Sequence, residues 1–400
     1  MVLHRKSIKN ILTVRYNPLD KSSFPLSTWK NFNYNLKDND GIQTEKLLTD
    51  SIRKNLSKEK SISISLSSGI DSSLCLGIIR KVFPDKKITG ICGVFGESFD
   101  ESIVAEKIAR KFNADFLTVN MESIFHQLPE IISITKKPKW NTYIHLIAKK
   151  AKTISNNIVT GDGADELFGG YTFRYEKFQN SFNHKGTWKD KVKNYLECHN
   201  RDWVIDQEQM FGRKMNFDWN EIYEYFRPYF QNKLDPLKQV MLADYNGKLL
   251  RDFIPLGKSI CSYYNIKGFP LFLESDIISF SHKISLEQKF DKNTLKGKLL
   301  LRTICKRLGI KHIDEKKGFS PALLLDWESN GKEIFKKFLI DKNAYVYKKD
   351  FINYNWIKNA LQIVNDDGDI RYLNRLISIL ALEIWYRVEI SREMKSSEKL

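Results

Sequence analysis

The sequence has few cysteines and no long apolar run. Its five cysteines are an odd number at wide spacing and form no CxxC pair, which disfavours a disulfide framework, a zinc ribbon and thioredoxin chemistry. No stretch approaches the run of about 18 apolar residues that a membrane-spanning helix needs, and the residues after Met1 lack the apolar core of a signal peptide. These absences predict a cytoplasmic protein with no membrane partner.

Acidic residues are also outnumbered. The chain of 400 residues has 48 acidic against 65 basic side chains, a formal net charge of +17, while 42% of its residues are hydrophobic. That composition is globular and excludes wholesale disorder, collagen-like chains and low-complexity chains. A basic excess can attract nucleic acid, but the basic side chains are scattered lysines rather than an arginine-rich stripe with interleaved aromatics. A nucleic-acid partner is therefore not expected.

Strand and helix patterns alternate in the first half of the chain. Ile62, Ile64 and Leu66 alternate with serines, as in a strand, and an apolar helical stripe runs from Leu74 to Pro84. The same order continues with strand patterns at 88–95, 116–119 and 158–160 and helical patterns from 102 and over 143–154. This alternation predicts an α/β fold, a parallel sheet flanked by helices. Beyond Tyr171 only helical patterns remain, including a buried C-terminal helix over 370–390, so the last part is predicted to be helical.

The segment from Ser67 to Ser73 joins the first strand to the first helix. Small residues at such a junction present backbone N–H groups, hydroxyls and the positive end of a helix to an anion, as in a phosphate site. No lysine ends this loop and no GxGxxG motif is present, so neither a P-loop nor a dinucleotide fingerprint is indicated. Asp71 would repel a phosphate unless a metal ion bridged the two, so it is predicted to hold Mg²⁺. The alternative is that Asp71 only caps the helix.

A second acidic loop, Gly161 to Tyr171, follows the strand at 158–160. It contains Asp162, Asp165 and Glu166 among four glycines. Because the carboxyl ends of neighbouring parallel strands open on one crevice, this loop is predicted to face the Ser67 loop. The alternative is a solvated acidic turn.

These two loops resemble a known family. Leu66 to Ser73 is similar to the S-(G/S)-G-x-D-S loop of the N-type ATP pyrophosphatases, and Gly161 to Tyr171 resembles the G-(D/E)-G-x-D-E-L-F-G-G-Y signature of their asparagine synthetase branch. Residues 298–302 resemble its K-x-L-L-R helix and residues 315–319 its P-K-x-G-F element. The resemblance covers roughly residues 44–390 and implies the adenine nucleotide alpha-hydrolase-like fold.

The resemblance also implies roles for individual residues, with ATP and Mg²⁺ as cofactors. Asp71 and Asp165 would bind the Mg²⁺ that holds the pyrophosphate. Lys316 would reach the α-phosphate, and Asp162 would lie near the amine of the second step. The residues that would bind the nucleotide are those of the Ser67 loop and those that frame the adenosine: Ser67, Ser68, Gly69, Asp71 and Ser72, then Leu66, Gly93, Val94, Thr160 and Gly161.

The sequence departs from the family's pattern in three places. Glutamine-dependent members begin with a cysteine after Met1 and a glutaminase domain, whereas this chain has Val2 and a short N-terminal extension, residues 1–43. Family members usually have a carboxylate just before a proline, and here the residues before that proline are basic, in Lys136-Lys137-Pro138. The family's D-R-x-x-M segment, on the side of the site that binds the substrate, is poorly matched by residues 257–274. The remaining boundaries are predicted at 44–330 for the ATP pyrophosphatase domain and 331–400 for a helical segment packed on it.

The predicted activity is an ATP-dependent, AMP-forming amide ligase. It would adenylate a small-molecule or peptide carboxylate and transfer the acyl group to ammonia or an amine, with a separate glutaminase subunit as one source of ammonia. A β-lactam or peptide-macrolactam cyclase remains an alternative because the substrate-side motif is lost. A tRNA-modifying ATP pyrophosphatase is a further alternative, for which cysteine pairs or an RNA-binding module would be expected and neither is found.

Overall fold

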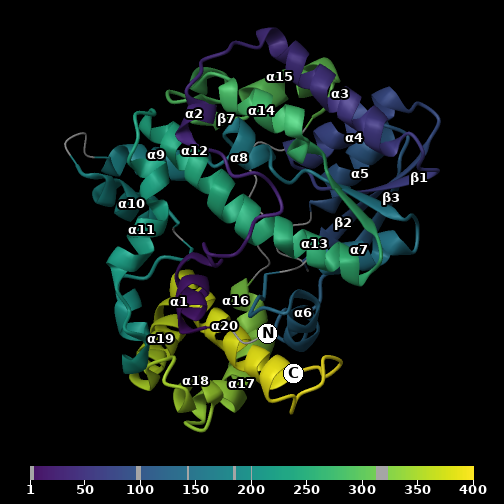
Figure 1. The fold of residues 1–400 in the computed structure, drawn as a ribbon. Coiled ribbons are helices and arrows are strands. Elements are labelled where there is room, and N and C mark those ends of the chain that lie inside the picture. The colour runs from purple at the N-terminus through teal and green to yellow at the C-terminus, as the bar shows by residue number, and fades with distance from the viewer. Residues whose placement is uncertain (1–3, 96–100, 142–143, 183–185, 200, 312–322) are drawn as a thin grey trace.

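The computed structural model describes residues 4–95, 101–141, 144–182, 186–199, 201–311 and 323–400 (Figure 1). Its centre is a five-stranded sheet in the order β3 (Asp115–Asn120), β2 (Lys87–Val94), β1 (Ser61–Ser65), β4 (Asn157–Thr160) and β5 (Lys267–Pro270). All neighbouring strands in it are parallel. The predicted parallel sheet is confirmed, and its strand order changes direction between β1 and β4, where parallel sheets open a crevice.

Helices cover both faces of this sheet (Figure 1). One face carries Ile62, Ile64 and Val159 and packs in one core with α3 (Ile42–Leu56), α4 (Ile70–Val82), α5 (Ser102–Lys111), α14 (Ser275–Lys283) and α15 (Leu299–Arg307). The other carries Ile91 and Ile158 and packs on α7 (Ile144–Lys152) and the end of α13 (Ile254–Tyr263). Burial on both faces explains why the central strands β1, β2 and β4 carry isoleucine and valine.

Two details of the sequence prediction are wrong. Helix α4 begins at Ile70, with Gly69 at its N-cap, so Asp71 and Ser72 lie in its first turn and not in the preceding loop. The N–H groups of a first turn have no helical partners, so small polar residues are tolerated there. The strand β5 was also missed, because Gly268 and Pro270 obscure any alternation. A proline is compatible with a strand at the edge of a sheet.

The remaining helices form two further cores. The first contains Phe178, Tyr195, Phe226 and Phe230 and joins α2 (Trp29–Phe32), α9 (Thr172–Ser181), α10 (Trp188–Glu197), α11 (Trp219–Phe230) and α12 (Pro236–Asp244), beside a short hairpin of β6 (Phe290–Asp291) and β7 (Lys296–Gly297). The second lies around α20 (Ile370–Trp385), which confirms the predicted C-terminal helix, and includes α1 (Arg5–Val14), α6 (Leu128–Thr135), α16 (Leu323–Asp326), α17 (Lys332–Phe335), α18 (Tyr345–Lys348) and α19 (Tyr354–Asp367). None of the described helices is long and apolar enough to cross a membrane.

The N-terminal segment is integrated into the second of these cores. Ile8 and Leu12 of α1 are buried there, and the Arg375 guanidinium of α20 donates hydrogen bonds to the Leu12 and Thr13 carbonyls. The same segment accounts for Lys137 in the Lys136-Lys137-Pro138 departure, because the Lys137 ammonium lies 2.5 Å from the Asp20 carboxylate. The lysine that replaces the family's carboxylate therefore ties the N-terminal segment to the loop after α6.

Candidate active site

Two loops meet at the carboxyl ends of β1 and β4. These strands pair directly, with Ser63 opposite Ile158. A Cβ atom added to Gly161, the first residue after β4, would lie 2.8 Å from the Asp71 Cβ atom and 3.3 Å from the Ser72 backbone nitrogen. The prediction that the two loops face one crevice is confirmed, and glycine at 161 is required because there is no room for a side chain.

Hydroxyl groups hold the first loop in shape. The Ser67 backbone N–H donates to Ser72 Oγ at 3.0 Å, and the Gly69 N–H donates to Ser67 Oγ at 3.2 Å. The Ser68 hydroxyl donates to Glu101 Oε2 at 2.9 Å. The loop thus leads into the first turn of α4 with its backbone fixed, an arrangement suited to an anion at the helix N-terminus.

The two predicted metal-binding carboxylates lie close to each other. A single ammonium, that of Lys298, lies 2.7 Å from Asp71 Oδ2 and 2.5 Å from Asp165 Oδ1. The other oxygen of Asp71 is buried and has no hydrogen-bond partner among the described residues. Two oxygen donors that converge on one point, with a further buried oxygen unsatisfied, fit a hard divalent cation.

Few protein ligands surround that point. In the described ranges, no group of three or more histidine, cysteine or acidic side chains is arranged so that it could hold a metal ion by itself. Mg²⁺ keeps several waters and binds through one or two carboxylates plus phosphate oxygens in nucleotide sites, so two aspartates are sufficient. The residues present therefore fit Mg²⁺ bound together with a polyphosphate. Gly69, and not Asp71, takes the capping position of α4, and the Asp71 Oδ2 atom accepts a hydrogen bond from Lys298, which disfavours the capping alternative.

Lys298 is the site residue that sequence reasoning missed. In the sequence it is only the first residue of the K-x-L-L-R segment, yet in the structure it is almost fully buried and precedes α15 with a left-handed backbone, φ 56°. Burial lowers the pKa of its ammonium, but the Asp165 and Asp71 carboxylates outweigh that effect and the pKa is raised. No local pattern marks this lysine among the many others in the chain, because both of its partners are distant in sequence.

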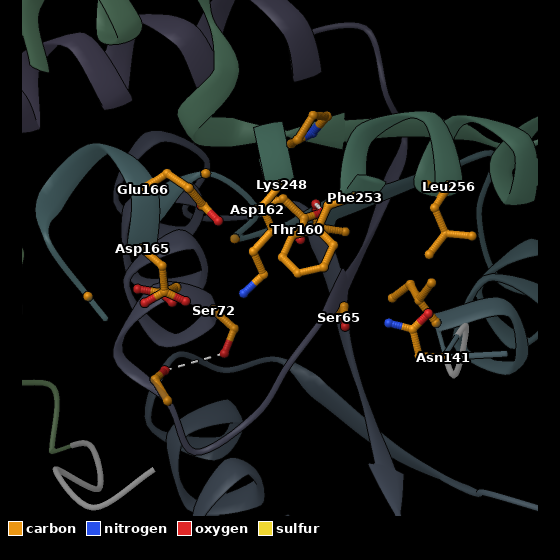
Figure 2. A pocket seen from close by; sticks show the side chains of 18 of the residues that line it. Ser65, Ser72, Asn141, Thr160, Asp162, Asp165, Glu166, Lys248, Phe253 and Leu256 are labelled. Carbon is orange, nitrogen blue, oxygen red and sulfur yellow. Dashed lines mark hydrogen bonds between the residues drawn. The ribbon is translucent and has the colours of Figure 1, made fainter. Parts of the chain in front are cut away.

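A cleft of about 1750 Å³ extends from the two loops (Figure 2). Among the predicted adenosine-framing residues, Leu66, Thr160 and Gly161 line it. Gly93 and Val94 end the neighbouring strand β2 but are not part of its wall. The predicted catalytic residue Asp162 also lines the cleft, and its Oδ2 atom accepts a hydrogen bond of 2.7 Å from the Thr160 hydroxyl. Lys316, the other predicted catalytic residue, lies outside the described residues.

Opposite the phosphate loop, the cleft has a second polar wall. The Tyr171 hydroxyl donates to Glu166 Oε1 at 2.5 Å, and burial together with the Asp165 charge raises the pKa of Glu166 to about 7. The Lys248 ammonium lies over the Tyr171 ring at 4.3 Å and the Phe253 ring at 5.0 Å. Burial and the Arg174 guanidinium lower the pKa of Lys248 to about 8.

Figure 2 shows Lys248 extending into the pocket beside Phe253. Both residues belong to a π-helical stretch, η5 (Tyr245–Phe253), and such stretches often occur at functional sites. In the sequence, the nearest sign of this wall is the divergence of residues 257–274 from the family's substrate-side segment. Lys248 and Phe253 lie just before that segment.

Comparison with known proteins links these loops to one family. The family model for asparagine synthase matches residues 43–387. A putative asparagine synthetase (glutamine-hydrolyzing) of Mycobacterium bovis is 30% identical over 147 residues, which cover 35% of this chain and 22% of that protein. Asparagine synthetase (glutamine-hydrolyzing) 1 of Bacillus subtilis is 21% identical over 391 residues, which cover 87% of this chain and 59% of that protein. The match thus spans less than two thirds of the length of either relative.

One solved structure of another protein is also similar to part of this chain. The NMN synthetase of Francisella tularensis is similar over 52% of this chain and 92% of its own, with 14% identity and a TM-score of 0.26. Because this TM-score is low, the structural similarity does not assign the chain to a family. That assignment rests on the family model and on the two loops.

Proposed function

Because this chain belongs to the asparagine synthase family over residues 43–387, we propose that it is an ATP-dependent, AMP-forming amide ligase. The observation that carries this proposal is the convergence of Asp71 and Asp165 beside the serine loop, at the point where the strand order changes direction. Such a site suits a nucleotide polyphosphate with its metal ion, and the cleft beyond it has room for a second substrate.

The first step forms an acyl-adenylate. A carboxylate oxygen of the substrate attacks the α-phosphorus of ATP, and pyrophosphate leaves with the electron pair of the broken P–O bond. Backbone N–H groups of the Ser67 loop and the N-terminus of α4 hold the phosphates, and Asp71 and Asp165 would hold Mg²⁺. The bound ion would supply positive charge where the leaving pyrophosphate gains negative charge.

The second step forms the amide. Ammonia or an amine attacks the acyl carbon, AMP leaves with its oxygen, and the nitrogen loses a proton. Asp162 is the acidic side chain proposed to take that proton, held in orientation by the Thr160 hydroxyl. The wall formed by Glu166, Tyr171 and Lys248 would contact the rest of the carboxylate substrate or the amine.

The decisive measurement is the nucleotide product. With an accepted carboxylate and amine, AMP and pyrophosphate are expected in equal amounts with the amide, and accumulation of ADP would contradict the proposal. An intramolecular amide would identify the lactam-cyclase alternative. The tRNA-modifying alternative gains no support from the described residues, in which no cysteine forms a disulfide and none is exposed.

We predict that Lys316→Ala lowers turnover by about 10² to 10³-fold with little change in ATP affinity, as expected for the loss of one preorganised charge. The assay is amide formation at saturating ATP. The adjacent Lys317→Ala is the matched control and should retain activity. If Lys317→Ala were the damaging change and Lys316→Ala the silent one, the alignment of this element with the family would be wrong by one residue.

We predict that this chain uses ammonium or an amine and releases no glutamate from glutamine. Glutamine hydrolysis needs an accessible thiolate beside a base. The thiols of Cys75, Cys198, Cys261 and Cys305 instead have raised pKa values, chiefly because they are buried. A glutamate-release assay with ATP and acceptor tests this. Stoichiometric glutamate would contradict it, whereas failure with ammonium would point to another amine or to an external glutaminase.

A further inference from the structure

The strongest unexplained feature of the site is the position of Lys298. Its ammonium lies between the two carboxylates that would bind the metal, 2.7 Å from Asp71 Oδ2 and 2.5 Å from Asp165 Oδ1. Two carboxylates held this close repel each other unless a positive charge separates them. In this structure, the Lys298 ammonium supplies that positive charge.

The surrounding chain is built to hold the lysine in this place. The Lys298 backbone N–H donates to the Phe168 carbonyl at the end of α8 (Ala164–Phe168) at 3.1 Å, and its carbonyl accepts from the Arg302 N–H at 2.9 Å. Its left-handed backbone is a conformation that is unfavourable for a non-glycine residue. Gly170 leaves the space, because a Cβ atom there would lie 2.3 Å from the Lys298 Cε atom and 1.9 Å from Asp165 Oδ1.

The lysine does not satisfy the carboxylates fully. Asp71 Oδ1 is buried without a hydrogen-bond partner, although the other oxygen of the same carboxylate accepts from Lys298. A buried oxygen left without a hydrogen-bond partner destabilises this arrangement. A divalent cation carries twice the charge and binds several oxygens at once, so it would compete successfully for the same two side chains.

We propose that Lys298 is an internal substitute for the metal ion: its ammonium holds Asp71 and Asp165 together in the nucleotide-free enzyme and is displaced when the divalent cation binds. The inference rests on the metal site of the proposed function. It assigns Lys298 a positioning role, in which the two carboxylates stay close before ATP arrives. It also makes metal binding competitive, so the free enzyme binds the metal more weakly than its two aspartates alone would allow.

The test is metal binding by the full chain without nucleotide. Lys298→Met keeps most of the side-chain length and removes the charge. It is expected to bind Mn²⁺ about tenfold more tightly than the unmodified chain, as followed by electron paramagnetic resonance of free Mn²⁺, because a competing charge at about 4 Å or less is removed. In EDTA the variant should melt at a lower temperature than the unmodified chain, and saturating Mg²⁺ should raise its Tm by the larger amount.

Lys296→Met is the matched control. Lys296 also lines the cleft and lies two residues earlier, but its side chain is exposed, whereas that of Lys298 is buried. Its substitution should change neither Mn²⁺ affinity nor Tm. Unchanged or weaker Mn²⁺ binding by Lys298→Met would overturn the proposal, since the lysine would then support the metal site rather than compete for it.

A measurement on the unmodified chain covers the case in which Lys298→Met does not fold. An amine-reactive reagent, followed by peptide mass spectrometry, should label Lys298 more in the presence of Mn²⁺ than in EDTA. Labelling of Lys238, which donates hydrogen bonds to the Tyr34 carbonyl and Asn35 Oδ1 away from the cleft, should not change. Equal labelling of Lys298 in both conditions would contradict displacement. The proposed ligase function is tested separately by ATP–pyrophosphate exchange, so absence of exchange together with Mn²⁺-dependent labelling would reject that function alone.

Discussion

Asp71→Asn and Asp165→Asn are each expected to lower carboxylate-dependent ATP–pyrophosphate exchange by about 10²-fold or more, because each change removes a charged oxygen ligand from Mg²⁺. Asparagine has nearly the same size, so the packing of α4 and α8 is retained. The Lys298 ammonium also keeps one of its two carboxylate partners in each variant. Exchange of labelled pyrophosphate into ATP is the direct assay, because it reports the adenylation step without the amine.

Asp276→Asn is the matched control for this pair. Asp276 lies in the first turn of α14, just as Asp71 lies in the first turn of α4, but Asp276 is exposed. Replacing Asp276 therefore removes the same charge from a helix N-terminus without changing the cleft. Exchange should stay near that of the unmodified chain. Near-normal exchange in both Asp71→Asn and Asp165→Asn would mean that the two loops do not share a metal ion.

Gly170→Ala is expected to lower exchange by about as much as Asp165→Asn, on the order of 10²-fold, since displacing a metal ligand is equivalent to removing it. An added methyl group would lie 1.9 Å from Asp165 Oδ1 and 2.3 Å from Lys298 Cε. Both atoms are at the far ends of their side chains, so the carboxylate and the ammonium move while the backbone remains. The melting temperature should therefore change little compared with the loss of exchange.

The matched control for Gly170→Ala is Gly257→Ala. Gly257 also lines the cleft, in α13, but a Cβ atom added there would meet nothing within 4 Å. Alanine is favoured over glycine inside a helix by about 1 kcal/mol, so this variant should keep its exchange activity and be slightly more stable. Wild-type exchange by Gly170→Ala would show that the space beside Asp165 is not needed for adenylation.

Much of the nucleotide half could be predicted from the sequence because its signals are local. Alternation of Ile62 and Ile64 with serines is visible within one strand, and the acidic loop from Gly161 follows directly on the next. Parallel pairing then brings Asp71 and Asp165 to the same edge of the sheet. The family resemblance added candidate roles for individual residues, and all of these roles remain predictions.

The other features depend on contacts between residues far apart in the chain. Lys298 lies 227 positions from Asp71, and no helical or strand period relates the two. Lys137 and Asp20 are 117 positions apart, so the anchoring of the N-terminal segment is equally invisible to a local pattern. The edge strand β5 forms because β4 offers it a partner, even though its own glycine and proline disfavour a strand. Short-range periodicity thus encodes the sheet and its loops, whereas tertiary packing alone selects which lysine, among many similar ones, neutralises the two aspartates.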